Sequence, residues 1–320
     1  HKALKIFKSK PSLPGTMLGD VLVEEKLISE KHFRNVLEKK AILERQSDTE
    51  NLTLADQLVG RSFGKVKVVS KLPPDTFCWN FRALRLDKQS EAVVRVLKPE
   101  LARDEAKARR FLERAARIAK VKHQCVAAIY DVRREEEYHA FTEELVEGTT
   151  LGRKLNEEGS LPPRHAVRIT LQVIQGLNAL HERGLFHGNL TPDNIIIGAR
   201  DRAVLVNIPA GPGLSTGGDA WRWLESLSLG FCAPEVFLDP INASVRSDMF
   251  SLGALLYRML IGIGPHVGDD ELELMLNNML GRHPAPKDIA PVISDRLNSC
   301  LLYTSPSPRD LSTSRMPSSA

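Results

Sequence analysis

Cysteine is scarce in this 320-residue sequence, and its cysteines are too isolated to form the pairs that zinc sites and disulfide frameworks use. The four are Cys78, Cys125, Cys232 and Cys300, with no CxxC pair among them. Such usage is typical of proteins from reducing compartments. We therefore expect a cytoplasmic protein with no metal site and no disulfide framework.

Long apolar runs are lacking as well. The most apolar stretch, residues 250–264, contains Arg258 and is shorter than the about 20 residues that cross a bilayer. The first residues do not read as a signal peptide. Basic patches interleaved with aromatic residues, which mark many nucleic-acid-binding surfaces, are also missing. These absences argue against a membrane segment in this chain and against a nucleic-acid partner.

What is present is the composition of a globular protein with a core. Apolar residues make up 42% of the sequence and charged residues 26%. The 44 basic and 40 acidic residues are interleaved along the chain, as on solvated helix faces.

The first part of the chain predicts a small helical module. We expect residues 1–15 to be a disordered or truncated N-terminus and residues 16–58 to form short amphipathic helices. Apolar residues recur there at intervals that line one face: Val21, Leu22, Leu27, Phe33 and Leu37.

Within this module the sequence LGDVLVEEKLISEKHF resembles the N-terminal module of bacterial type II secretion and pilus ATPases. Met17, Lys26 and Lys40 stand where that motif has arginine, glycine and glutamine. We therefore expect a helical module that binds a protein partner or acts as a spacer, rather than one that binds a nucleotide.

Residues 60–299 read as an α+β domain with strands first and helices later. Strands are expected over residues 64–97, 126–132 and 139–146, and a helix over 104–121 with Phe111, Ala115 and Ile118 on its apolar face. A second helix follows Pro162, with an expected core stripe of Val167, Leu171, Ile174 and Leu177. Residues 300–320 are rich in Ser, Thr and Pro, and we expect them to be a non-native tail.

Three motifs in this domain stand in a familiar order. His187 to Asn194 read HGNLTPDN, Ala233-Pro234-Glu235 follow 39 residues later, and residues 247–253 read SDMFSLG. The first resembles the H-R-D-L-x-x-x-N catalytic loop of protein kinases, and the second their A-P-E motif. Over residues 60–298 the chain resembles bacterial serine/threonine protein kinases. The resemblance implies a two-lobed fold with a small β-rich N-lobe and a larger helical C-lobe.

The resemblance also shows which catalytic positions differ. Asn189 stands at the position of the catalytic base, and an amide has no useful proton affinity. Thr191 replaces the usual lysine of the loop, and Asn207 replaces the aspartate of D-F-G, with Pro209 in place of its glycine. Asn194 alone remains of the metal-binding pair that the resemblance implies.

The nucleotide pocket is altered too. Arg95 stands at the position of the phosphate-binding lysine, Arg114 at that of its glutamate partner, and Glu143 at the gatekeeper position. We expect Glu143 to bridge one or both arginines, because a lone buried carboxylate is costly and the two cations would repel one another. Between Leu72 and Ala83 the chain has no glycine with which to approach a phosphate closely.

These substitutions favour a pseudokinase that binds a protein partner as a scaffold, needs no cofactor and does not phosphorylate. The alternative is a serine/threonine protein kinase that uses ATP and magnesium with atypical catalytic residues. An intermediate possibility is a protein that binds nucleotide without transferring phosphate.

Overall fold

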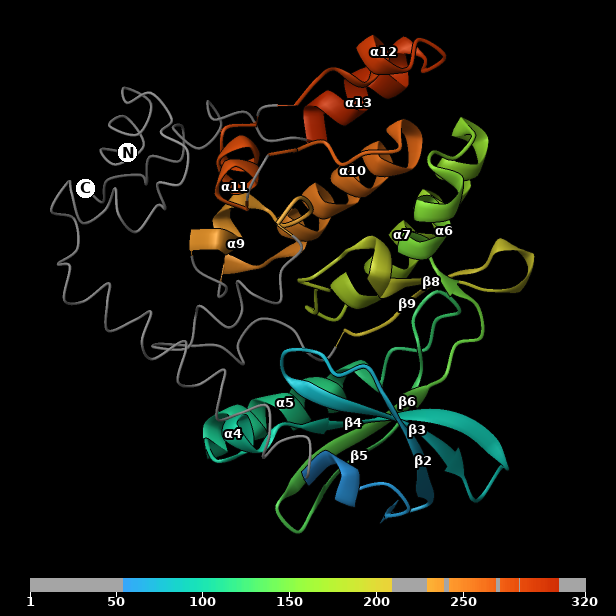
Figure 1. Cartoon of the computed structure of the whole chain (residues 1–320), viewed down its shortest axis with the longest axis vertical. Helices are drawn as coiled ribbons and strands as arrows, with labels where there is room; N and C mark the ends of the chain where they lie inside the picture. The colour runs from blue at the N-terminus through green and yellow to red at the C-terminus, as the bar shows by residue number, and fades with distance from the viewer. Residues whose placement is uncertain (1–53, 209–228, 239–241, 269–270, 282, 305–320) are drawn as a thin grey trace, which may run out of the picture. The chain divides into compact units, whose positions relative to one another are not determined.

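A computed structural model describes residues 54–208, 229–238, 242–268, 271–281 and 283–304 (Figure 1). The chain divides into two compact units, His1–Leu58 and Val59–Ala320. The N-terminal helical module expected over residues 16–58 lies almost entirely outside the described residues, as do Pro209 and most of the expected tail. The second unit carries the motifs identified in the sequence.

An antiparallel six-stranded sheet opens the second unit, with strand order β1-β2-β3-β4-β6-β5 (Figure 1). The bounds of its strands are β1 Ser62–Phe63, β2 Val66–Leu72, β3 Cys78–Arg85, β4 Ser90–Leu97, β5 Ile129–Glu135 and β6 Tyr138–Glu144. The residues of β4 from Ala92 onward are buried, which explains why its sequence is almost continuously apolar around Arg95. Strands β2 to β6 overlap the ranges in which the sequence predicted strands.

Helix α5 (Glu105–Ile118) follows the short helix α4 (Pro99–Ala102) and packs against this sheet. The helix begins where the Asp104 side chain accepts hydrogen bonds from the N–H groups of the first turn. Its buried face includes Phe111, Ala115 and Ile118, as predicted, and Phe111 contacts Phe141 of β6 with ring centroids 5.3 Å apart.

The helical lobe includes a small three-stranded sheet of β7 (Thr149–Thr150), β8 (Ile195–Ile197) and β9 (Ala203–Leu205). Its described helices are α6 Leu151–Glu158, α7 Pro163–His181, α9 Pro234–Leu238, α10 Val245–Ile261, α11 Glu271–Met279, α12 Pro286–Ile289 and α13 Asp295–Thr304, with 3-10 turns η1 Pro192–Asn194 and η2 Ala199–Asp201. Helix α10 is buried over most of its length, so it forms the centre of this lobe. No helix in these described ranges is both long and apolar enough to cross a membrane.

Helix α7 buries a different face from the predicted one. Val167, Leu171 and Ile174 are exposed, and of the predicted stripe only Leu177 is buried. The buried face comes close to the segment before β5 at Gly176, where a Cβ atom would lie 2.8 Å from the carbonyl oxygen of Cys125. The prediction was wrong because two faces of α7 carry apolar residues. The face that contains Gly176 is the one that packs closely, because glycine has no Cβ atom at this approach.

The expected domain boundary at residue 299 falls inside a helix. Helix α13 continues to Thr304, and Leu301 is buried in the core of the helical lobe. The expectation that residues 300–320 are non-native stays a prediction, because residues 305–320 lie outside the described ranges.

Candidate nucleotide and catalytic site

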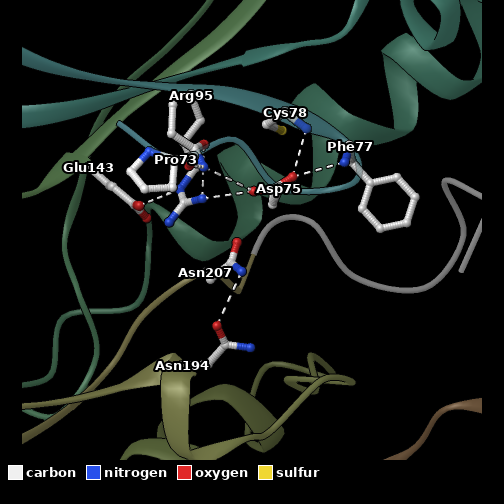
Figure 2. Close-up of polar contacts among 9 residues, drawn as sticks. Pro73, Asp75, Phe77, Cys78, Arg95, Glu143, Asn194 and Asn207 are labelled. Atoms are coloured by element: carbon white, nitrogen blue, oxygen red, sulfur yellow. Dashed lines mark hydrogen bonds and ion pairs between the residues drawn. The ribbon is translucent and has the colours of Figure 1, made fainter. Parts of the chain in front are cut away.

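Arg95 forms the centre of a polar cluster on the first sheet (Figure 2). It lies opposite Asn80 of β3 and opposite Phe141 of β6, so Glu143, two residues further along β6, is its diagonal neighbour on the same face. Nε of Arg95 donates to Oε1 of Glu143, and Nη1 donates to Oδ1 of Asn80 at 3.1 Å. The predicted contact between Glu143 and Arg95 is therefore present.

The Arg95 guanidinium stays charged in spite of its burial. Burial by itself would lower its pKa, but the charges of Glu143 and Asp75 outweigh that effect, so the pKa is raised above its usual value. The Glu143 side chain is only 4% exposed, whereas that of Asp75 is 22% exposed. One buried cation thus pairs with two carboxylates of different accessibility.

Asp75 is a member of this cluster that the sequence analysis missed. It lies in the loop between β2 and β3, and its Oδ2 accepts a hydrogen bond from Nη1 of Arg95 at 3.0 Å. Its Oδ1 accepts from the N–H groups of Phe77 at 2.9 Å and Cys78 at 2.7 Å. An aspartate after two prolines is a typical turn signal, so the turn could have been predicted, but not its contact with Arg95.

Arg114 lies apart from this cluster and serves a different purpose. From α5 its Nη2 donates to the carbonyl oxygen of Phe186 at 2.5 Å, and its Nε to that of Ile208 at 3.4 Å. Burial lowers the pKa of its guanidinium to about 10, although the charge of Asp248 acts in the opposite direction. Arg114 therefore ties α5 to the segments before the catalytic loop and after β9, and its described contacts do not include Glu143.

The catalytic loop is held by Asp248 of α10, which is fully buried. Its carboxylate accepts hydrogen bonds from the N–H groups of His187 and Gly188, each at 2.8 Å, and contacts Nε2 of His181 at 2.8 Å. Burial lowers the pKa of His187 to about 4, so this histidine is neutral near pH 7. Its Nδ1 accepts from the N–H of Asn189 at 3.3 Å and thereby fixes the loop.

Two amides meet where the loop faces the end of β9. Nδ2 of Asn194 donates to the carbonyl oxygen of Asn189 at 2.8 Å, and Nδ2 of Asn207 donates to Oδ1 of Asn194 at 3.2 Å. Asn207 has a φ of 61°, in the left-handed region that asparagine tolerates better than most residues.

The other amide atom of Asn207 has a different environment. Its Oδ1 is buried and has no hydrogen-bond partner among the described residues. Figure 2 shows this oxygen on the side of Asn207 that faces Arg95 and Asp75. A buried acceptor of this kind can still accept a hydrogen bond from a donor or contact a cation.

Thr191 is buried and lies in a small cavity between the catalytic loop and the segment that leads into α9. The cavity is also lined by Asn189, Cys232, Ala233 and Ser247. Hydrogen bonds and the shared cavity thus bring Asn189, Thr191, Asn194 and Asn207 into one region. Figure 2 shows Arg95 and Glu143 on the sheet above Asn207.

The residues present do not fit a magnesium ion held in the usual way. Protein sites for this ion supply one or two carboxylates besides the substrate's phosphates, whereas Asn194 and Asn207 offer neutral amide oxygens. Within the described ranges no three His, Cys, Asp or Glu side chains gather closely enough to hold a metal ion.

Comparisons with known proteins extend the resemblance seen in the sequence. The family model described as "Protein kinase domain" matches residues 76–309. Serine/threonine-protein kinase PknL of Mycobacterium tuberculosis is 28% identical over 232 residues, which cover 72% of this chain and 58% of that protein. Serine/threonine-protein kinase PknB of Mycobacterium leprae is 29% identical over 199 residues, covering 60% of this chain and 31% of that protein.

A solved structure shows the same fold. The kinase domain of Mycobacterium tuberculosis PknI superposes with a TM-score of 0.60 at 19% identity, covering 78% of this chain and 90% of that one. The chain spans little more than half the length of PknL and about a third of PknB.

These relatives overturn the expectation of a pseudokinase that does not phosphorylate. The matching proteins are serine/threonine kinases, and nothing in the comparisons marks a loss of catalysis. The expectation was wrong because it counted substituted side chains, whereas phosphoryl transfer depends mostly on positioning and electrostatics, which several residues share.

The family model covers more than two thirds of the sequence, and the two-lobed fold, the catalytic loop and the A-P-E motif all lie within it. This chain belongs to the protein kinase domain family.

Proposed function

We propose that this chain is a serine/threonine protein kinase that transfers the γ-phosphoryl group of ATP to protein hydroxyls with atypical catalytic residues. Its matched relatives are named as serine/threonine kinases. The observation that carries the proposal is the anchoring of the catalytic loop by Asp248, which keeps Asn189 and Asn194 together and facing Asn207. This arrangement supports the proposal although the side chains differ from those of the family's motifs.

The reaction asks little covalent chemistry of these residues. The oxygen of a serine or threonine forms a bond to the γ-phosphorus while the bond from phosphorus to the leaving oxygen of ADP breaks, and the hydroxyl proton passes to water. Because the transition state is loose, the attacking oxygen needs its proton removed only late, so orientation is the main requirement. The amide of Asn189 can orient the hydroxyl by a hydrogen bond without accepting its proton.

The charge of the phosphates must also be neutralised. Arg95 is a buried cation of the site, and its guanidinium can donate a hydrogen bond to a phosphate oxygen. The amides of Asn194 and Asn207 offer neutral oxygens, which do not fit a carboxylate-bound magnesium ion.

The absence of a carboxylate base predicts slow transfer. General acid–base catalysis contributes about 10²- to 10⁴-fold to such reactions. A kinase that positions its substrates but lacks the base is expected to work slower by about that factor.

We further propose a cytoplasmic location and a protein partner, which is the phosphorylated substrate or a protein bound by the N-terminal module. The described cysteines Cys78, Cys125 and Cys232 are free and buried, which supports a reducing compartment. The resemblance of residues 18–33 to the module of secretion ATPases supports a role in binding a protein.

The test is transfer of labelled γ-phosphate from ATP to the chain itself and to serine- and threonine-containing proteins. The control is Asn189→Leu, purified identically, which removes the amide that orients the hydroxyl. We expect incorporation on serine or threonine that falls at least tenfold in the control. Equal incorporation in both preparations would point to a contaminating kinase and contradict the proposal.

A further inference from the structure

The loop between β2 and β3 wraps its own backbone around a carboxylate. Residues 73–77 contain no glycine, yet the N–H groups of Phe77 and Cys78 converge on one oxygen of Asp75 at 2.9 and 2.7 Å. Adjacent N–H groups that point at one oxygen form a concave anion-binding site. The second oxygen of Asp75 accepts from Nη1 of Arg95 at 3.0 Å, which adds a fixed positive charge (Figure 2).

Each of these donors is one that a phosphate group also accepts from. Backbone N–H groups and a guanidinium are the groups that cradle phosphates in proteins. The Asp75 carboxylate is thus bound as a phosphate would be, through two main-chain donors, the guanidinium of Arg95 and, at 3.4 Å, Nδ2 of Asn80.

The exposed fractions of the two carboxylates indicate which of them can be displaced from Arg95. Arg95 faces both Glu143 and Asp75, and the side chain of Glu143 is 4% exposed, on a central strand of the sheet. The side chain of Asp75 is 22% exposed and belongs to a loop that contacts Arg95 from the other side. A second anion can therefore replace Asp75 at Arg95 while the pair of Arg95 and Glu143 stays in place.

We propose that Asp75 is an internal anion, which occupies the position of a phosphate between the N–H groups of Phe77 and Cys78 and Nη1 of Arg95. The identity of that phosphate as part of a nucleotide rests on the proposed kinase function. A phosphate that enters must displace the Asp75 carboxylate, so Asp75 weakens nucleotide binding and sets the concentration of ATP at which the site fills.

The variant Asp75→Asn separates charge from shape. Its amide oxygen can still accept from the N–H groups of the loop, but it no longer competes with a phosphate by charge. We expect it to bind ATP and inorganic pyrophosphate at least tenfold more tightly than the unchanged chain. Adenosine, which carries no phosphate, is expected to bind both proteins alike.

Calorimetric titration of the full chain with ATP, pyrophosphate and adenosine tests the site. The matched control is Asp87→Asn, which removes a carboxylate from the next turn of the same sheet, where Asp87 pairs with Arg85 at 3.4 Å. Asp87→Asn is expected to leave all three affinities unchanged. Affinities of Asp75→Asn for ATP and pyrophosphate that equal or fall below those of the unchanged chain would overturn the proposal, as would an equal gain for Asp87→Asn.

Two further measurements keep the outcome clear. If Asp75→Asn does not melt cooperatively, Asp75→Ser, whose hydroxyl can accept from the same N–H groups, is titrated with the same ligands and the same expectation. Phosphate transfer is measured on the same preparations. Tighter pyrophosphate binding without any transfer would uphold this site and refute the kinase proposal, whereas transfer with unchanged affinities would do the reverse.

Discussion

Removal of Arg95 is expected to destabilise the chain far more than removal of the charge on its partner. In Arg95→Met the Glu143 carboxylate, whose side chain is 4% exposed, loses the cation that compensates its burial. Breaking a buried ion pair by removing one partner costs about 3–5 kcal/mol of the free energy of unfolding. Asp75 loses the same cation but can turn to water, since its side chain is 22% exposed, and should add little.

In Glu143→Gln, by contrast, Arg95 keeps its hydrogen bonds to Asp75 and Asn80. We expect a cost of about 1–2 kcal/mol, that of a charged hydrogen bond weakened to a neutral one. The double variant Arg95→Met/Glu143→Leu removes both charges, and it should recover most of the loss because apolar replacement of a buried pair is often nearly neutral.

The assay is urea unfolding of the full chain followed by circular dichroism. The free energies of unfolding are compared between variants whose dependence on urea concentration, the m-value, is the same. The matched control is Arg82→Met, which breaks the pair of Arg82 and Glu91 on the same sheet, where both side chains are about half exposed. Such a surface pair is worth about 0–1 kcal/mol. The reasoning is refuted if Arg95→Met costs no more than Arg82→Met, or if the double variant is as unstable as Arg95→Met.

Three further outcomes are expected. Burial holds the pKa of His187 at about 4, below its usual 6.5, so the unfolded chain takes up the proton first as the pH falls. The free energy of unfolding is therefore full above pH 6.5 and falls by up to about 3 kcal/mol as the pH drops toward 4. Unfolding measured over that range should lose this slope in His187→Gln, and a slope equal to that of the unchanged chain would contradict it. Arg114→Met leaves two carbonyl oxygens without their donor and should lower the free energy of unfolding in urea by about 1–3 kcal/mol. The control Arg117→Met, in which the lost carbonyl contacts are exposed, should lower it by less than about 1 kcal/mol. Equal costs would argue against the role of Arg114 in tying α5 to its neighbouring segments. Asn189→Asp supplies a carboxylate base and should raise the rate of phosphate transfer about 10²-fold or more. The rate should then depend on pH through the ionisation of that carboxyl. An unchanged rate would show that residue 189 does not face the substrate hydroxyl.

The parts of the fold that the sequence predicted are those fixed by local pattern. The buried face of α5 follows from the spacing of Phe111, Ala115 and Ile118, because only one face of that helix is apolar. Helix α7 is apolar on two faces, and its burial was decided by the close approach at Gly176, which no periodicity records. Patterns thus predicted elements but not always their orientation.

The candidate site likewise contains a contact that the sequence could predict and others that it could not. The contact of Glu143 with Arg95 could be predicted because neighbouring strands of a sheet place diagonal residues on one face. The contact of Asp75 with Arg95 depends on how a five-residue loop folds, and the path of Arg114 depends on carbonyl groups 72 and 94 residues away along the chain. Contacts made with backbone atoms leave no mark in the side-chain pattern, so the sequence could not show them.

The central claim is that a kinase site with two amides in place of two carboxylates still transfers phosphate. The most direct measurement is the stoichiometry of phosphoserine and phosphothreonine formed per ADP released by the full chain, determined by mass spectrometry under single-turnover conditions. We predict slow but measurable transfer, with phosphate on serine or threonine that matches the ADP formed and falls at least tenfold in Asn189→Leu. ADP release without phosphorylated protein, or no conversion of ATP over the lifetime of the folded chain, would contradict the account.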